Sequence, residues 1–343
     1  MANSNDSSIS NPLFFVITTL YNSQKTIEKT LESMLGQTSS NFVHYIYDDG
    51  SPENCDALIE EYIQEVGKRS RPYKVIYEKG RKNLGVDGAH IYCFKKIDLP
   101  FFTWLDSGNV VTPCYFAEFE KAISAHPDYA IYQADYFPYP QASRRLHPVS
   151  ASLDKKNFVR EDILPNLCSA TNIVCEMVII NLKRYQNINP AWLFLPNKEY
   201  GGFYYDSQIL FELAAAGERR YFIDKPLSYV LCDPHSASTA FRLNPKLIAQ
   251  GESQLLKTLN FSSARRGFVL EYLSFLELVE AIPSLCLTSR EKDAIETYQE
   301  ALEFIAEKKL PSYYFPLQKN KRRFYWLAKH PHWLHWYKKM KKR

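Results

Sequence analysis

The segment Asn41-Phe42-Val43-His44-Tyr45-Ile46-Tyr47-Asp48-Asp49-Gly50-Ser51 combines an apolar run with two adjacent acids. Its run of β-branched and aromatic residues from Phe42 to Tyr47 predicts a buried strand. The run stops at two adjacent carboxylates, Asp48 and Asp49, which are followed by Gly50. Ligands of open α/β sheets bind beyond the carboxyl ends of the strands, so both acids are site candidates. The alternative is a solvated turn in which Gly50 supplies the tight geometry.

Strand and helix patterns alternate on either side of this stretch. The first strand pattern is a continuous apolar run, as expected for a strand covered on both faces. The last of these strands also ends on an acid, Asp106. This alternation predicts a mainly parallel α/β sheet that carries the acids of both strand ends along one edge. The expected strands are 13–18, 42–47, 73–77 and 101–105, and the expected helices are 27–35, 54–66 and 89–96.

The composition is that of a soluble globular protein with a sizeable core. The chain has 343 residues, of which 45% are hydrophobic and 23% charged. Residues 1–11 are polar, which argues against a secretory signal, and no apolar run approaches the ~20 residues of a spanning helix. The 7 cysteines are scattered and never stand at Cys-x-x-Cys spacing. This distribution argues against a disulfide framework or a zinc site and favours a reduced, cytoplasmic compartment.

Positive charge is concentrated at the C-terminal end. Residues 308–343 hold 12 of the 42 Lys and Arg and no Asp or Glu, so the remainder of the chain is net acidic. Trp333, Trp336 and Tyr337 fall at helical spacing among these lysines. The mixture predicts a helix that lies on an anionic membrane surface. A docked helical arm, a dimer contact and a basic nucleic-acid patch are alternatives, of which nucleic-acid binding is disfavoured because no recognition motif is present.

Several short motifs, in a fixed order, resemble glycosyltransferase family 2, whose members use nucleotide sugars and have the GT-A fold. The resemblance implies a Rossmann-like GT-A domain over 1–240, followed by a helical extension over 241–307 and the basic aromatic tail. The motifs are residues 16–22 (Val-Ile-Thr-Thr-Leu-Tyr-Asn), 31–38 (Leu-Glu-Ser-Met-Leu-Gly-Gln-Thr), 48–51 (Asp-Asp-Gly-Ser), 83–86 (Asn-Leu-Gly-Val), 104–109 (Trp-Leu-Asp-Ser-Gly-Asn), 201–206 (Gly-Gly-Phe-Tyr-Tyr-Asp), 227–229 (Leu-Ser-Tyr) and 235–238 (His-Ser-Ala-Ser).

The resemblance also implies which residues grip the donor. Asp48 and Asp49 are expected to contact the nucleotide, because a carboxylate accepts hydrogen bonds from a uracil imide or from ribose hydroxyls. Arg81 or Lys82 could contact phosphate, although basic residues in such a loop are more often solvated. The full expected donor set is Thr18, Tyr21, Asn22, Asp48, Asp49, Asn83, Gly85, Asp106 and Ser107.

A divalent cation, Mn²⁺ or Mg²⁺, is the implied cofactor, held in the family by an Asp-x-Asp motif. This chain departs from the motif, because Asp106 fills the first acid position and Gly108 stands at the second. Asp106 and His235 are the expected ligands, with Asn109 as a further candidate, and the donor phosphates complete the shell. Metal-independent catalysis and loss of activity are the alternatives.

Asp206 is the expected general base, since the family pattern places an acid at this point. Tyr205 replaces the Glu that usually precedes it, and Glu199 is the fallback. Taken alone, Asp206 could equally be a helix N-terminal carboxylate stabilised by the macrodipole. The aromatic residues between 130 and 197 either line an acceptor glycan site or fill the core.

Together these features predict an inverting glycosyltransferase that moves a sugar from a UDP-sugar to a hydroxyl of a cell-surface glycan or lipid-linked acceptor, such as lipopolysaccharide or capsule. Its expected location is cytoplasmic, peripheral on the inner face of the cell membrane. Two rivals remain. A nucleotidyltransferase would carry a Gly-rich basic loop after the first strand, where this chain has Thr19-Leu20-Tyr21-Asn22. A non-catalytic nucleotide-sugar-binding module would explain Gly108.

Overall fold

The computed structural model describes residues 12–52, 54–139, 160–167, 178–194, 205–231 and 245–263, with 265–266, 269–270 and 273. The predicted tail at 308–343 and most of the predicted extension lie outside these residues. The elements are β1 (Phe14–Leu20), α1 (Ile27–Leu35), β2 (Phe42–Asp48), α2 (Asp56–Gly67), β3 (Lys74–Lys79), α3 (Gly85–Phe94), β4 (Phe101–Trp104), β5 (Val110–Val111), α4 (Tyr115–Ala125), β6 (Ile131–Tyr139), α6 (Leu164–Leu167), β7 (Val178–Asn181), α7 (Leu182–Gln186), α8 (Tyr205–Ala215), β8 (Arg220–Leu231) and α10 (Pro245–Thr258).

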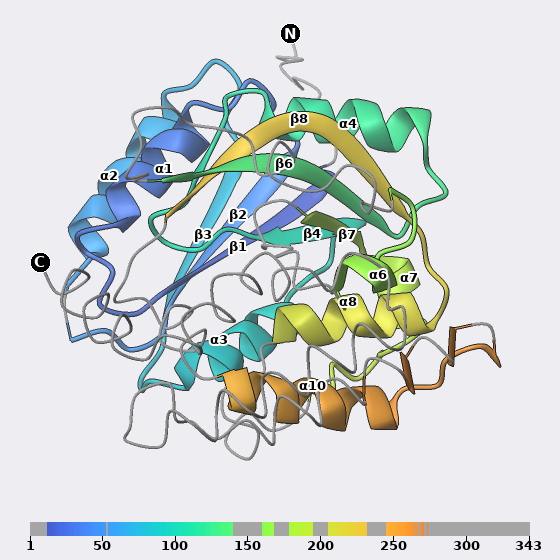
Figure 1. Cartoon of the computed structure of the whole chain (residues 1–343). Coiled ribbons are helices and arrows are strands. Elements are labelled where there is room, and N and C mark those ends of the chain that lie inside the picture. Colours follow the sequence, from blue (N-terminus) through green and yellow to red (C-terminus); the bar gives the residue numbers. More distant parts are fainter. Residues whose placement is uncertain are drawn as a thin grey trace, which may run out of the picture.

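Within the described residues, the strands form one 8-stranded sheet in the order β3-β2-β1-β4-β7-β6-β8-β5 (Figure 1). The strands β3, β2, β1 and β4 are mutually parallel, as the alternating pattern predicts. The strand β7 then pairs antiparallel with both β4 and β6, while β6 and β8 are parallel. The α/β class is therefore confirmed, and the sheet is mixed.

Helices cover the sheet on both sides (Figure 1). Along β1, Phe14 and Val16 pack with α1, α2 and α4, whereas Phe15 and Ile17 pack with α3, α8 and α10. This burial on both faces accounts for the continuous apolar run in the sequence. The same alternation sends the next two side chains of β1, Thr18 and Thr19, to opposite faces of the sheet.

The aromatic residues of the middle segment fill the core where the structure describes them. Tyr132 is 0% exposed, and Trp192 is 7% exposed and stacks on Phe94 with ring centroids 5.0 Å apart. Phe194 packs against the same cluster. The aromatic residues of this region are predicted either to line an acceptor glycan site or to fill the core, and Tyr132 and Trp192 fill the core.

Candidate functional site

The candidate site lies along the carboxyl ends of β1, β2 and β4. These strands are parallel neighbours, so their ends meet at one edge of the sheet, as the sequence predicts. Backbone hydrogen bonds continue past the strands, from Asp49 N to Leu20 O at 2.8 Å and from Leu105 N to Ile17 O at 2.8 Å. Asp48, Asp49 and the residues leading to Asp106 are thereby placed along a common edge.

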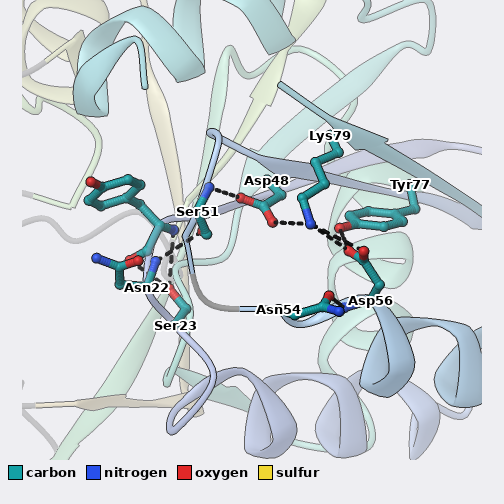
Figure 2. A network of polar contacts seen from close by, with 9 residues as sticks. Asn22, Ser23, Asp48, Ser51, Asn54, Asp56, Tyr77 and Lys79 are labelled. Carbon is teal, nitrogen blue, oxygen red and sulfur yellow. Dashed lines mark hydrogen bonds and ion pairs between the residues drawn. The ribbon is translucent and has the colours of Figure 1, made fainter. Parts of the chain in front are cut away.

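Asp48 supports the loop that follows β1. Its side chain is fully buried, and Oδ1 accepts a hydrogen bond from the Ser51 backbone N–H at 2.8 Å. The Ser51 hydroxyl oxygen in turn accepts from the Asn22 backbone N–H at 3.0 Å (Figure 2). Asn22 has a φ of 53°, a left-handed conformation that asparagine adopts more readily than most residues. The chain of contacts from Asp48 through Ser51 therefore fixes the turn at Asn22.

The second oxygen of Asp48 faces a lysine. Oδ2 has no hydrogen-bond partner among the described residues, and Lys79 Nζ lies 3.8 Å away (Figure 2). The same ammonium group donates to Asp56 at 3.0 Å, and this hydrogen bond raises the pKa of Lys79. Lys79 therefore stays charged and partly neutralises the buried carboxylate of Asp48.

Asp49 supports a different loop, the one that leads into α3. Both of its carboxylate oxygens accept the Leu84 backbone N–H, at 2.9 and 3.0 Å, and Oδ2 also accepts the Gly85 N–H at 3.0 Å. Burial, with a further contribution from the charge of Asp48, raises the pKa of Asp49, and the hydrogen bonds from these amides oppose that shift. Because Asp49 holds these amides, α3 begins at Gly85, four residues before its predicted start.

The predicted donor residues thus divide into an exposed group and a supporting group. Tyr21 is 48% exposed, and Asn22, Asn83 and Gly85 are exposed, as are Arg81 and Lys82. Asp48 and Asp49 lie beneath these loops, at 0% and 3% exposure. Thr18 is turned into the core, where its hydroxyl lies 3.0 Å from His44 Nε2. The solvent-accessible surface at this edge of the sheet is therefore formed by the two loops, and the two acids hold those loops in place.

The loop after β4 exposes Asp106 and constrains the residues that follow it. The Asp106 side chain is 48% exposed. The Ser107 and Thr26 hydroxyls lie 2.8 Å apart, and the Gly108 N–H donates to Thr30 Oγ1 at 2.8 Å. Gly108 has a φ of +97°, and a Cβ there would lie 2.7 Å from Leu231 Cδ2. The position of the missing second acid therefore favours glycine in both backbone conformation and space.

Of the three predicted metal ligands, Asp106, Asn109 and His235, only Asp106 has a described side chain that is suited to a divalent cation. Asn109 is 6% exposed, and its Oδ1 accepts the Leu231 N–H at 2.7 Å, so this oxygen is committed to the end of β8. His235 lies outside the described residues, and the part of the chain that is described contains no group of three His, Cys, Asp or Glu suited to a metal. One exposed carboxylate suits Mg²⁺ or Mn²⁺ when donor phosphates and water provide the other ligands.

Asp206 lies in the first turn of α8, where the sequence predicts the base. Its Oδ1 accepts the Ser207 backbone N–H at 2.7 Å. Burial raises the pKa of Asp206 to about 7, and the negative charges of Asp106 and Asp87 act in the same direction. The electrostatic influence of Asp106 on Asp206 means that the strand end and the helix start face a common region.

Two residues of this region are missed by the sequence analysis. Asp87 lies in the first turn of α3 and carried no motif signal beyond its place two residues after Gly85. His90 reads as a core residue of an apolar helix, and it is 1% exposed. Its Nδ1 donates to Val86 O at 2.8 Å, which leaves Nε2 as an acceptor in the neutral ring. Burial lowers the pKa of His90, so the neutral form predominates.

His90 contacts three parts of the site at once. Its Nε2 lies 3.4 Å from Thr19 Oγ1 and 4.0 Å from Asp106 Oδ1. Its ring stacks on Tyr205, the residue before Asp206, at a centroid distance of 4.1 Å and an interplanar angle of 22°. Because the imidazole is neutral, His90 and Asp106 do not form an ion pair.

Comparisons with known proteins identify a family that part of the chain matches. The family described as "Glycosyl transferase family 2" matches residues 15–180. The hyaluronan synthase of Streptococcus pyogenes is 33% identical over 108 residues, which are 31% of this chain and 25% of that protein. The chain therefore spans about a quarter of the length of the curated relatives it matches.

Solved structures resemble the whole fold at low sequence identity. The structure of S. aureus TarS 1-349 in complex with UDP-GlcNAc has a TM-score of 0.60 at 13% identity, and the alignment covers 91% of this chain and 92% of that one. The mannosyltransferase PcManGT from Pyrobaculum calidifontis, in complex with GDP-Man and Mn²⁺, has a TM-score of 0.55 at 13% identity over 93% and 86% of the two chains. These likenesses confirm the predicted GT-A type of fold.

Proposed function

We propose that this glycosyltransferase, whose residues 15–180 belong to glycosyl transferase family 2, transfers a sugar with inversion from a UDP-sugar to a hydroxyl of a cell-surface glycan or lipid-linked acceptor. The observation that carries this assignment is the carboxyl group of Asp206, whose pKa is raised to about 7 beside the exposed strand end of Asp106. In this assignment Asp206 is the base and Asp106 is the acid beside the donor diphosphate, and both lie in one region of the site.

Asp206 acts as the general base of this proposal. Inverting transfer requires removal of the acceptor hydroxyl proton as the oxygen attacks the anomeric carbon from the side opposite the nucleotide. A carboxylate with a pKa near 7 suits this step, because at neutral pH much of it is deprotonated while it keeps substantial basicity. Glu199, the fallback base, lies outside the described residues.

The donor nucleotide lies, in this proposal, between the loop at Tyr21 and Asn22 and the loop at Asn83. Asp48 and Asp49 contribute by holding these loops, so that the exposed groups are positioned before the donor arrives. The choice of uridine is supported by the TarS structures with UDP and UDP-GlcNAc. The GDP-Man complex of PcManGT shows that this fold also accommodates guanosine in another protein, so the nucleoside is part of the test.

Asp106 is the protein carboxylate that would hold a divalent cation at the donor diphosphate, with Ser107 beside it. Bound there, Mn²⁺ or Mg²⁺ supplies positive charge that stabilises the departing diphosphate. The Mn²⁺ complex of PcManGT supports the cation. Asn109 keeps its place as a structural residue, because its oxygen holds Leu231.

The basic aromatic tail at 308–343 is the proposed membrane contact, and it motivates a lipid-linked or surface-bound acceptor on the inner face of the cell membrane. Within the described residues, no helix combines the length and the apolar character needed to cross a bilayer. Truncation after Tyr314 should release the protein from anionic liposomes and leave UDP binding intact. Unchanged liposome binding would contradict the membrane role.

The deciding experiment measures transfer and donor hydrolysis with a panel of UDP- and GDP-sugars, with and without Mn²⁺. We expect one UDP-sugar to be consumed, with Mn²⁺ increasing the rate. Binding of UDP without consumption of any donor would favour the non-catalytic module, the rival that Gly108 suggests. Release of diphosphate from a nucleoside triphosphate and a sugar phosphate would instead indicate a nucleotidyltransferase.

A further inference from the structure

We propose that His90 is a positioning residue for the transfer reaction, which holds the start of α8, and with it Asp206, against the strand end that carries Asp106. The proposal rests on the proposed function for the roles of the two acids. Its structural basis is independent of that function, because His90, on α3, lies against the end of β1, the residue Asp106 after β4 and the start of α8.

The hydrogen bond from Nδ1 to Val86 O, at 2.8 Å, fixes the rotation of the imidazole ring within α3. Val86 immediately follows Gly85, whose N–H is held by Asp49. The orientation of the ring is therefore linked to the same loop that we propose to flank the donor.

The flat face of the ring supports Tyr205 at a centroid distance of 4.1 Å. Tyr205 is 5% exposed and packs edge-on against Trp104 at the end of β4, with centroids 5.4 Å apart. Because Tyr205 is the first residue of α8, the stack fixes the start of the helix and with it the position of the next residue, Asp206.

The polar edge of the ring faces the strand ends. Nε2 lies 3.4 Å from the Thr19 hydroxyl and 4.0 Å from Asp106 Oδ1. One side chain thus hydrogen-bonds the end of β1, stacks on the residue that precedes the base and lies near the acid after β4. A displacement of about 1 Å between catalytic groups is enough to reduce turnover about 100-fold.

Three substitutions separate the contacts of His90. His90→Phe keeps a flat ring for Tyr205 and removes the hydrogen bonds with Val86 and Thr19. His90→Gln and His90→Asn both remove the ring, and His90→Asn keeps a donor near Val86 O. From the opposite side, Tyr205→Leu removes the stack while His90 stays. His90→Gln and Tyr205→Leu should lower kcat about 100-fold with the Kd for UDP changed less than about threefold, and His90→Phe, which keeps the stack, should retain more activity than His90→Gln.

His44 offers a matched control, because it is a second fully buried histidine that hydrogen-bonds a β1 threonine, on the opposite face of the sheet. His44→Gln should lower the melting temperature without the selective loss of kcat. If that variant does not fold, Tyr62→Phe removes the other hydrogen bond of His44 and serves in its place.

Amide hydrogen exchange gives a readout that does not depend on transfer. His90→Gln should speed exchange over residues 209–212, whose amides bond to the carbonyls of the first turn of α8, and His44→Gln should leave that segment unchanged. A folded His90→Gln variant that keeps wild-type kcat, or that loses no protection over residues 209–212, would overturn the inference. Absence of transfer by the wild-type protein would instead contradict the proposed function, and the exchange result would still decide whether His90 positions α8.

Discussion

Asp49 accepts the backbone N–H of Leu84 at 2.9 Å and so joins the end of β2 to the start of α3. Its neighbour Asp48 is turned to the loop after β1, through Ser51 and Asn22. Two adjacent acids therefore organise the two loops that border the candidate donor site. Removing the acceptor of such a backbone amide lowers the stability of the fold by more than the net contribution of the hydrogen bond. Substitution of either acid therefore tests these contacts.

Asp49→Ala is expected to destabilise the fold by about 1–3 kcal/mol, because the amides of Leu84 and Gly85 lose their acceptor. Asp49→Asn should cost less, since burial already opposes the charge and one oxygen remains to accept. Both variants should bind UDP more weakly through the displaced loop. Urea unfolding and calorimetry measure these effects, and an Asp49→Ala variant of wild-type stability would show that the loop is held by other contacts.

Gly108→Asp, which restores the Asp-x-Asp pattern, is expected to destabilise the protein by about 1–3 kcal/mol rather than to improve metal binding. The backbone there has a φ of +97° and a new Cβ would approach Leu231. Gly217, with a φ of +80° and open space around it, separates the two causes. Gly108→Ala should therefore lower the melting temperature more than Gly217→Ala. Equal losses would mean that crowding by Leu231 contributes nothing, and tighter Mn²⁺ binding by Gly108→Asp would contradict the structural assignment.

Asp206→Asn is expected to lower kcat by about 10²–10⁴-fold with little change in UDP binding, as for loss of a general base. In the wild-type protein, kcat/KM should rise with pH through a limb near 7, the pKa of Asp206 in the fold. Full activity in Asp206→Asn would remove it from the mechanism.

The raised pKa of Asp206 predicts that the stability of the fold decreases as pH rises. Folding raises the pKa of Asp206 from its ordinary value of 3.8 to about 7, so the folded chain binds more protons between these values. Stability should therefore fall as pH rises through this window, and Asp206→Asn should gain a few kcal/mol at pH 8 and little at pH 4. Unfolding free energies at the two pH values measure this difference, and an equal effect at both would show that Asp206 is not held in a desolvated site.

The lowered pKa of His44 predicts the opposite slope, a free energy of unfolding that decreases as pH falls. Burial lowers the pKa of His44 from 6.5 to about 3, so the unfolded chain binds the extra proton between these values. Its contribution is complete above pH 6.5 and is lost as pH falls toward 3, at about 1.4 kcal/mol per pH unit. His44→Gln should flatten the acid limb of the stability profile by that amount. An unchanged limb would mean that His44 is already protonated in the folded protein.

Much of the first half of the fold was predictable because its signals are local. The apolar run of β1, the helical spacing of α1 and the strand that ends at Asp48 each appear within ten residues of sequence. Asp206 was also placed by a local motif and lies at the start of α8 as expected. The antiparallel entry of β7 carried no such signal, since the pairing of β4 with β7 joins residues about eighty positions apart.

The α/β alternation and the positions of the acids follow from the sequence, because side-chain periodicity and turn chemistry depend on neighbours in the chain. The contacts that those acids make follow from tertiary packing. It assigned Asp48 and Asp49 to backbone amides of two distant loops, turned Thr18 inward to His44, and brought His90 between Thr19, Asp106 and Tyr205. These roles depend on desolvation and on contacts between separate elements. Both arise only when the chain has packed.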